Sequence, residues 1–459
     1  MKLSKTEVRC STSTIPELRF EDQALTSFSG LVIIQKLVQQ LGLKERLRSC
    51  VRHLGPQASY HPATIFLLLV THLVIGWRRL RDLDYYRGDP LVTRLLGLRR
   101  MPNVSTVTRA LRAMDTGVVD RVRALLHSLV TARVLSSKLS RLTLDFDGSV
   151  LSTKSRTTEG TAVGFNRKSK GSRSYYPLLA TVAQTGQVFD LHHRPGNVHD
   201  SNGARAFIEA CMKSVRDAGF RGILESRLDS AHFNDETLLW LDEHGIQFSV
   251  SVPFERFPAL KKVIEDRQRW RRIDDDWSYF EEAWKPGSWK RGFRCFVIRQ
   301  RVRVARKGPI QLELFEPIQR DYEYKVIMTN KKGSARAILG FHNGRGSQEN
   351  TIGEIKSHLQ FDYIPTRRKI GNQVYSLAAC LAHNLVRELQ MRVRTPDRVT
   401  TIKRACLWVF ETAGTFRKRL LQRAGRLTRP QGVLALTMAG NRATAEEMHR
   451  YMSALDEAA

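Results

Sequence analysis

Acidic residues occupy segments of this chain that have the pattern of core strands. Asp145 and Asp147 stand two residues apart in RLTLDFDGSVL (141–151), so both side chains project from the same face of a strand. Asp229 closes a second strand, and Glu349 lies at a helix start after the glycine-containing loop FHNGRGS. A buried carboxylate is costly without a cation or hydrogen bonds beside it. Acids at these places therefore indicate a cation site.

Carboxylates in this pattern suit the chemistry of phosphodiester bonds. In-line attack on a phosphodiester puts charge on the entering and the leaving oxygen, and two divalent cations about 3.5–4 Å apart can stabilise both. Mg²⁺ prefers hard oxygen ligands, so a few carboxylates with open positions for water and phosphate suit it. A single Asp at a strand end is more often a turn or cap residue than a ligand. The interpretation therefore depends on whether the fold brings the three acids together.

The elements that must position the acids follow a recognisable order. Three strands come first, and then helix, strand, helix and strand alternate, which is the order of a ribonuclease H-like α/β core. In that order the first strand, the fourth strand and a later helix converge at one edge of the sheet. The expected strands span 141–151, 177–184, 187–196, 221–231 and 246–253, and the expected helices span 201–219 and 234–245.

The predicted fold class is α/β, with a ribonuclease H-like mixed-sheet core, a β-rich insertion and helical regions at both ends. Residues 1–135 predict a helical region, because apolar residues recur there at three- and four-residue spacing. Residues 136–253 predict the first part of the core. Residues 254–325 contain four tryptophans and a stretch of period two, FRCFVIRQRVRVA, and predict the β-rich insertion. Residues 326–395 predict the second part of the core, and 396–459 a basic helical C-terminal region.

A candidate DNA-recognition helix occurs in the piece MPNVSTVTRALRAM (101–114). Ser105 and Thr106 stand near the helix start, and Arg109 and Arg112 follow at a spacing of three. A short polar N-terminus followed by arginines on one face suits a helix that docks in a DNA groove. A plain amphipathic helix with Ser or Thr as N-cap is an equally good interpretation.

Charge indicates the partner. The 459 residues include 75 Lys and Arg against 45 Asp and Glu, which gives a net charge of +30. A body with this excess repels itself unless a polyanion shares the charge, and the clustering of the basic residues favours nucleic acid. No basic amphipathic anchor or lipidation signal supports a membrane partner. Basic residues of the C-terminal region include Arg404, Arg417, Lys418, Arg419, Arg423, Arg426 and Arg429.

Cysteine usage and apolar runs bear on location. The six cysteines are widely separated and include no CxxC pair, which is typical of reduced cysteines in a cytoplasmic protein. The N-terminus MKLSKTEVRC lacks the apolar stretch of a signal peptide, and the longest apolar run, Ile65 to Ile75, is too short to span a bilayer. We expect a cytoplasmic protein.

The segment HNGRGSQENTIGEIK (342–356) resembles a signature of the DDE transposases of bacterial insertion sequences, Tyr-xx-Arg-xxx-Glu-xxxxxx-Lys. Arg345, Glu349 and Lys356 fall on its Arg, Glu and Lys positions, and His342 stands where the signature has Tyr. The resemblance covers roughly 140–390 well and the N-terminal region more loosely. Further segments similar to this family are DFDGS (145–149), RPGNVHDS (194–201) and RLDSAHF (227–233).

The resemblance implies an enzyme that frees a 3′-OH at each transposon end and joins it to target DNA. Asp147, Asp229 and Glu349 would be the catalytic, metal-binding acids for two Mg²⁺ ions, with Mn²⁺ as a substitute. Asp147 fits the family pattern best because Ser follows it in the sequence DGS, and Asp145 stays the alternative first carboxylate. Implied partners are the terminal inverted repeats and target DNA, both double-stranded, and a second copy of the chain in a synaptic homodimer. The resemblance also implies that residues 1–135 are a DNA-end-binding region, and that the protein works in a bacterial cytoplasm and is associated with the nucleoid when bound to DNA.

DNA contacts are also implied by the resemblance. Arg345 and Lys356 would hold phosphates of the transposon end, with His342 beside them. Glu349 and Lys356 are seven residues apart, which is two helical turns on one face. In related transposases an aromatic residue of the insertion can stack on a flipped base, and Trp289 is the candidate here, although packing in the insertion's own core is the stronger interpretation.

Two rival functions stay open. One is a ribonuclease H-like nuclease that cuts DNA without joining it. The other is a catalytically silent, transposase-derived DNA-binding protein. The presence of all three acids argues against the silent protein, and the large end-binding region argues against the nuclease.

Overall fold

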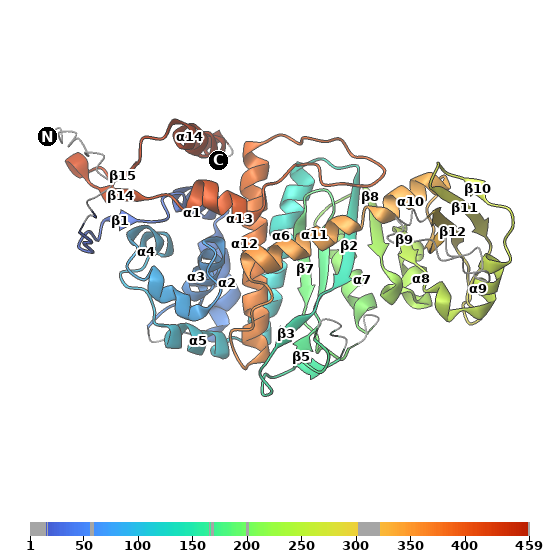
Figure 1. The fold of residues 1–459 in the computed structure, drawn as a ribbon. Coiled ribbons are helices and arrows are strands. Elements are labelled where there is room, and N and C mark those ends of the chain that lie inside the picture. The colour runs from blue at the N-terminus through green and yellow to red at the C-terminus, as the bar shows by residue number, and fades with distance from the viewer. Residues whose placement is uncertain are drawn as a thin grey trace.

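The structure is a computed structural model and describes residues 15, 17–55, 59–164, 166, 169–198, 202–301 and 322–457. Helices form its N-terminal part (Figure 1). Residues 31–51 form two helices, because Gly42 between them has φ 55, a left-handed conformation that interrupts the helix. The helices are α1 (Leu31–Gln40), α2 (Leu43–Val51), α3 (Pro62–Val74), α4 (Pro90–Leu96), α5 (Val104–Ala113) and α6 (Thr116–Ser136).

The core sheet confirms the predicted fold class. The five core strands are β2 (Arg141–Gly148), β6 (Leu178–Val182), β7 (Gln187–His192), β8 (Ile223–Leu228) and β9 (Gln247–Ser251). They lie in the order β7-β6-β2-β8-β9. β2 is antiparallel to β6, and β6 to β7, whereas β2 is parallel to β8, and β8 to β9. This order and these directions define a ribonuclease H-like core.

The insertion extends this sheet. Its strands continue antiparallel beyond β9 in the order β13-β12-β11-β10, so one sheet runs from the core to the far end of the molecule (Figure 1). The bounds are α9 (Pro258–Glu265), β10 (Arg271–Arg272), β11 (Trp277–Glu282), β12 (Arg294–Arg301) and β13 (Tyr322–Thr329). The predicted period-two stretch 293–305 matches β12 as far as Arg301, and its last residues lie outside the described part of the chain.

The two faces of the core sheet differ in chemistry. Leu142, Leu144 and Phe146 of β2 belong to an apolar cluster that includes residues of α7 (Ala204–Asp217) and α8 (Asp235–Glu243). Thr143, Asp145 and Asp147 alternate with them and project from the opposite face. α10 (Ala335–Asn343) and α11 (Gly346–Leu359) follow β13. α12 (Lys369–Val393) lies between helices α1–α5 and the sheet, whereas α6 packs on β7 itself (Figure 1). The polar face is therefore the one that can carry chemistry.

The C-terminal region differs from the helical expectation for 396–459. Residues 394–412, all of which the structure describes, contain no helix, and a strand pair follows that joins a strand near the N-terminus. This pairing links residues about 400 positions apart, so local sequence patterns do not indicate it. The elements are α13 (Ala413–Phe416), a π-helical turn (Arg417–Leu421), β14 (Gly425–Thr428), β15 (Ala435–Met438), β1 (Leu25–Thr26) and α14 (Arg442–Glu457).

The remaining strands in the described part of the chain form a small sheet of their own. This sheet has the order β3-β5-β4 and follows β2, with β3 (Leu151–Thr153), β4 (Ala162–Val163) and β5 (Arg173–Tyr175). Within the residues that the structure describes, no helix combines the length and the apolar character that a membrane crossing requires.

Candidate active site

Two of the predicted acids lie side by side at one edge of the sheet. β2 and β8 are parallel neighbours in which Asp145 is paired with Arg227. Two residues further along each strand stand Asp147, at the end of β2, and Asp229, immediately after β8. Parallel strands bring their carboxyl ends to the same edge, so the fold itself juxtaposes these acids.

Arg345 joins the two acids. Its Nη2 lies 3.1 Å from Oδ2 of Asp147 and 3.5 Å from Oδ2 of Asp229. The three side chains are only 18%, 19% and 26% exposed, respectively. Arg345 is the N-cap residue of α11, so the helix start presents its guanidinium to the sheet edge. The arrangement is a pair of carboxylates with one cation between them.

Protonation differs between the two acids. Burial raises the pKa of Asp147 to about 6, an effect that Arg345 opposes and that the negative charge of Asp229 reinforces. Burial also acts to raise the pKa of Asp229, but the hydrogen bond and electrostatic attraction of His232, the charge of Arg345 and a hydrogen bond from the backbone of Ala231 together outweigh it and hold this pKa below its ordinary value. His232 is buried, and its Nδ1 lies 2.7 Å from Oδ1 of Asp229. Asp147 is therefore the acid that takes up a proton first.

The third predicted acid lies on α11, which runs beside the end of β2. Nε2 of the buried Gln348 donates to the carbonyl oxygen of Asp145 at 2.9 Å. About two turns further along the helix, Nζ of Lys356 donates to the carbonyl oxygen of Val150 at 3.0 Å. Glu349 follows Gln348 in the first turn of α11 and is exposed. The helix thus carries Glu349 close to the strand that carries the acid pair.

The donor set suits a divalent cation in part. Two adjacent carboxylates offer the hard oxygens that Mg²⁺ prefers, and the guanidinium of Arg345 shows that a positive charge is stabilised between them. Across the described residues, no set of three or more His, Cys, Asp or Glu side chains is arranged to hold a metal ion. Asp147 and Asp229 therefore fit a metal site, whereas the side chain of Glu349 does not join them in one ligand set in this structure.

Comparison with known proteins identifies the family. The family model described as transposase DDE domain, group 1, matches residues 11–459. The chain belongs to this DDE transposase family. Membership implies DNA transposition and the use of a divalent metal.

Solved structures and curated proteins add little to this DDE transposase assignment. Among solved structures, the chain is similar to a piggyBac transposase in a synaptic complex with hairpin DNA. The identity is 10% and the TM-score 0.45, over 82% of this chain and 78% of that one. No curated protein matches the chain.

Asp145, the alternative first carboxylate, has a partner of its own. It is fully buried, and the Nε and Nη2 atoms of Arg227 lie 2.5 and 2.6 Å from its two oxygens. A carboxylate held in this way by a buried guanidinium is not open to a cation. In this transposase fold, Asp147 is the acid of β2 that lies at the sheet edge.

Two predicted DNA contacts are covered by protein. His342 is buried, with Nδ1 3.0 Å from Oγ of Ser249 and Nε2 2.8 Å from Oγ of Ser251. Burial lowers the pKa of His342 to about 3, so the ring is neutral. Trp289 is 8% exposed and packs on Phe233 at a centroid distance of 4.5 Å. Neither side chain presents a face to DNA, and for Trp289 the packing interpretation accounts for what is seen.

The predicted recognition helix is amphipathic. Val107, Ala110 and Leu111 of α5 are buried, while the predicted DNA-facing residues Ser105, Arg109 and Arg112 are exposed or half-buried, as is Thr106. The N-cap residue is Asn103, so Ser105 and Thr106 lie inside the helix and neither caps it. The arginines that reach the surface keep α5 available to a polyanion.

Sequence reasoning missed the residues that organise the site. Arg227 stands two residues before Asp229, as Asp145 stands two residues before Asp147. This equal spacing is the sequence signal that could have indicated a pair between Arg227 and Asp145 on neighbouring strands. Gln348, directly before Glu349, anchors α11 to β2. Several arginines of the basic C-terminal region have partners within the protein. Arg417 is buried and donates to the carbonyl oxygens of Val74 and Leu73.

Proposed function

We propose that this DDE transposase cuts the ends of a bacterial insertion sequence in a metal-dependent reaction and joins them to target DNA. The observation that carries the proposal is the pair Asp147 and Asp229 at the carboxyl edge of a ribonuclease H-like sheet, with Arg345 between them. Glu349 is the proposed third carboxylate, because α11 runs beside the end of β2.

Each residue has a distinct proposed role. Two Mg²⁺ ions, or Mn²⁺, would activate the attacking water or 3′-OH and stabilise the leaving oxygen. Asp147 and Asp229 would hold these cations, and His232 fixes the orientation of Asp229. The guanidinium of Arg345 lies against the same carboxylate oxygens, so a bound cation would compete with it and leave it available to a DNA phosphate. Lys356, two helical turns from Glu349, contacts a neighbouring phosphate of the transposon end.

The regions around the core have proposed roles in holding DNA. The helical region 1–135 binds the terminal inverted repeats, with Arg109 and Arg112 on the outer face of α5. The net charge of +30 supports contact with long stretches of DNA backbone. Two copies of the chain hold two transposon ends. The catalytic core has two parts, which the insertion 254–325 separates, and a basic region follows residue 395.

A cleavage and joining assay tests the proposal. A labelled duplex that carries the inverted repeat is incubated with the protein in Mg²⁺ and Mn²⁺, and precut ends are offered with a target plasmid. Asp147→Asn, Asp229→Asn and Glu349→Gln should abolish cleavage while end binding persists. Glu243→Gln, which neutralises an exposed acid on α8, is the matched control and should cut normally.

The outcomes separate the rival functions. Cleavage without strand transfer from precut ends identifies a nuclease on the same core. Full binding of the inverted repeat without cleavage in either metal identifies a silent DNA-binding descendant. Normal cutting by any one of the three acid variants contradicts the role proposed for that acid.

A further inference from the structure

The polar face of β2 and β8 carries paired polar and charged residues behind the acid pair. In the register of these strands, Thr143 lies opposite Glu225, and Asp145 lies opposite Arg227. All four side chains are buried. Buried charges persist in folded proteins when partners satisfy them. The covering segments must therefore supply those partners.

Arg227 connects four parts of the chain. From β8, two of its nitrogens bind the carboxylate of Asp145 on β2. Its Nη1 donates to the carbonyl oxygen of Phe341 in α10 at 3.2 Å and to that of Lys403 at 2.7 Å. Lys403 belongs to residues 394–412, which we call the C-terminal strap. One fully buried guanidinium thus ties the strap to the two strands that end in Asp147 and Asp229.

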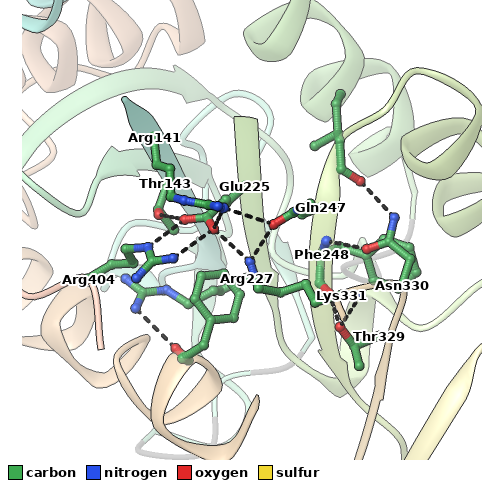
Figure 2. Close-up of polar contacts among 12 residues, drawn as sticks. Arg141, Thr143, Glu225, Arg227, Gln247, Phe248, Thr329, Asn330, Lys331 and Arg404 are labelled. Atoms are coloured by element: carbon green, nitrogen blue, oxygen red, sulfur yellow. Dashed lines mark hydrogen bonds and ion pairs between the residues drawn. The ribbon is translucent and has the colours of Figure 1, made fainter. Parts of the chain in front are cut away.

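The strap is held a second time at Glu225. Arg404 donates to both oxygens of this buried carboxylate, at 2.7 and 3.0 Å, and Lys331 and Arg141 converge on it from other segments (Figure 2). Arg404 has φ 48, a left-handed conformation that non-glycine residues keep only where their surroundings hold them. The backbone is therefore held in an unfavourable conformation so that Arg404 reaches Glu225.

The strap also packs against the turn that carries Arg345. Gly344 lies directly before Arg345, between α10 and α11. A Cβ atom at Gly344 would collide with the carbonyl oxygen of Lys403 and with Nη1 of Arg227. Gly346, two residues later, has open space at the same position. Neither glycine has a positive φ, so close packing alone distinguishes them.

We propose that Arg227, Arg404 and Gly344 are positioning residues, which let the C-terminal strap hold the α10–α11 turn in register with the acid pair. The strap reaches the site from about 170 residues beyond β8 and fixes the segment from which Arg345 meets Asp147 and Asp229. Loosening the strap displaces Arg345 and the start of α11 without removing any group that touches DNA or metal. Cleavage is then slowed, whereas the affinity for end DNA, to which the helical region 1–135 contributes, stays near that of the wild type.

The test compares matched variants in single-turnover cleavage of preformed end complexes. Gly344→Ala should slow cleavage about 10- to 100-fold, the effect expected of a displacement near 1 Å, whereas Gly346→Ala should leave the rate nearly unchanged. Arg404→Ala should act like Gly344→Ala, Arg404→Lys should recover part of the rate, and Arg398→Ala removes an exposed charge from the same strap as control. The dissociation constant for end DNA should stay near that of the wild type in all five.

A second readout does not depend on cleavage. Limited proteolysis without DNA should cut the strap faster in Gly344→Ala and Arg404→Ala than in their controls. The melting temperature of the rest of the protein should change little. The inference rests on the proposed cleavage activity, so a wild-type chain that fails to cut DNA counts against that activity. The proteolysis comparison then still tests whether Gly344 and Arg404 hold the strap in place. Equal cleavage rates in Gly344→Ala and Gly346→Ala, or equal losses of end binding and cleavage in Arg404→Ala, would overturn the positioning role.

Discussion

Replacing Arg345 with Gln should strengthen metal binding in the protein without DNA. The guanidinium lies 3.1 and 3.5 Å from carboxylate oxygens of Asp147 and Asp229. A cation that binds these oxygens must therefore displace it or share them with it. Gln keeps much of the side chain's length but has no charge, so the two acids attract a divalent cation more strongly.

The magnitude follows from the geometry. At an effective dielectric of about 20, each of these contacts amounts to roughly 5 kcal/mol of gross attraction. The side chains are about one-fifth exposed, and desolvation offsets most of that attraction, which leaves a net effect of about 1–3 kcal/mol. At 1.4 kcal/mol for each factor of ten, Mn²⁺ should bind Arg345→Gln about 5- to 140-fold more tightly than the wild type.

The assay is a titration of free Mn²⁺ by electron paramagnetic resonance at pH 8, where Asp147 is ionised. Asp147→Asn in the same background should remove the binding and so locate it. Arg336→Gln removes an equal charge from the exposed face of α10 and should leave the affinity unchanged. In a chelator, Arg345→Gln should unfold at lower temperature than the wild type, because two half-buried acids lose their counter-charge. Mn²⁺ affinity equal to or weaker than that of the wild type would refute this reasoning.

The remaining predictions concern the protonation of Asp147, the contact of Lys356 with DNA and the packing of Trp289. Because burial raises the pKa of Asp147 to about 6, Mn²⁺ affinity should fall about tenfold for each pH unit below 6. Metal-free stability should rise as the pH falls from about 6 to 4, since the folded acid takes up its proton before the unfolded one does, and Asp147→Asn should lose this rise in urea unfolding. Lys356→Ala should weaken end binding most at low salt and reduce the slope of log affinity against log salt by about one, and an unchanged slope would exclude a phosphate contact. Trp289→Ala should lower the free energy of unfolding by about 3–5 kcal/mol, because its ring fills the apolar cluster beside Phe233, and an undiminished unfolding midpoint would contradict that packing.

The core and the acid pair were predictable because their signals are local. Apolar residues alternate with Thr143, Asp145 and Asp147 along β2, so a strand with one polar face follows from the residues themselves. The order of strands and helices then leaves few ways to assemble a sheet, and connections between parallel strands restrict them further. Asp147 and Asp229 meet because both stand at carboxyl ends of neighbouring parallel strands.

Other features of the site were not predictable from local patterns. Trp289, which precedes Lys290 and Arg291, has the surroundings of a DNA-facing aromatic, yet the fold packs its ring against Phe233. His342 occupies a signature position, yet two serines of β9 take both of its ring nitrogens. Such outcomes depend on which distant segment covers a side chain, and burial is a property of the assembled chain.

The sequence by itself determined the fold class, the family signature and the strand ends on which two acids stand, because periodicity and spacing act over a few residues. Only the tertiary structure decided that Arg345 lies between those acids, that Arg227 pairs with Asp145, and that the C-terminal strap contacts Arg227 of β8. The physical reason is that a buried charge needs a partner, and the partner is chosen by packing between segments far apart in the chain. Glu349 depends on both: the sequence signature identifies the residue, whereas the contact of Gln348 with β2 places its helix and leaves the Glu349 side chain exposed.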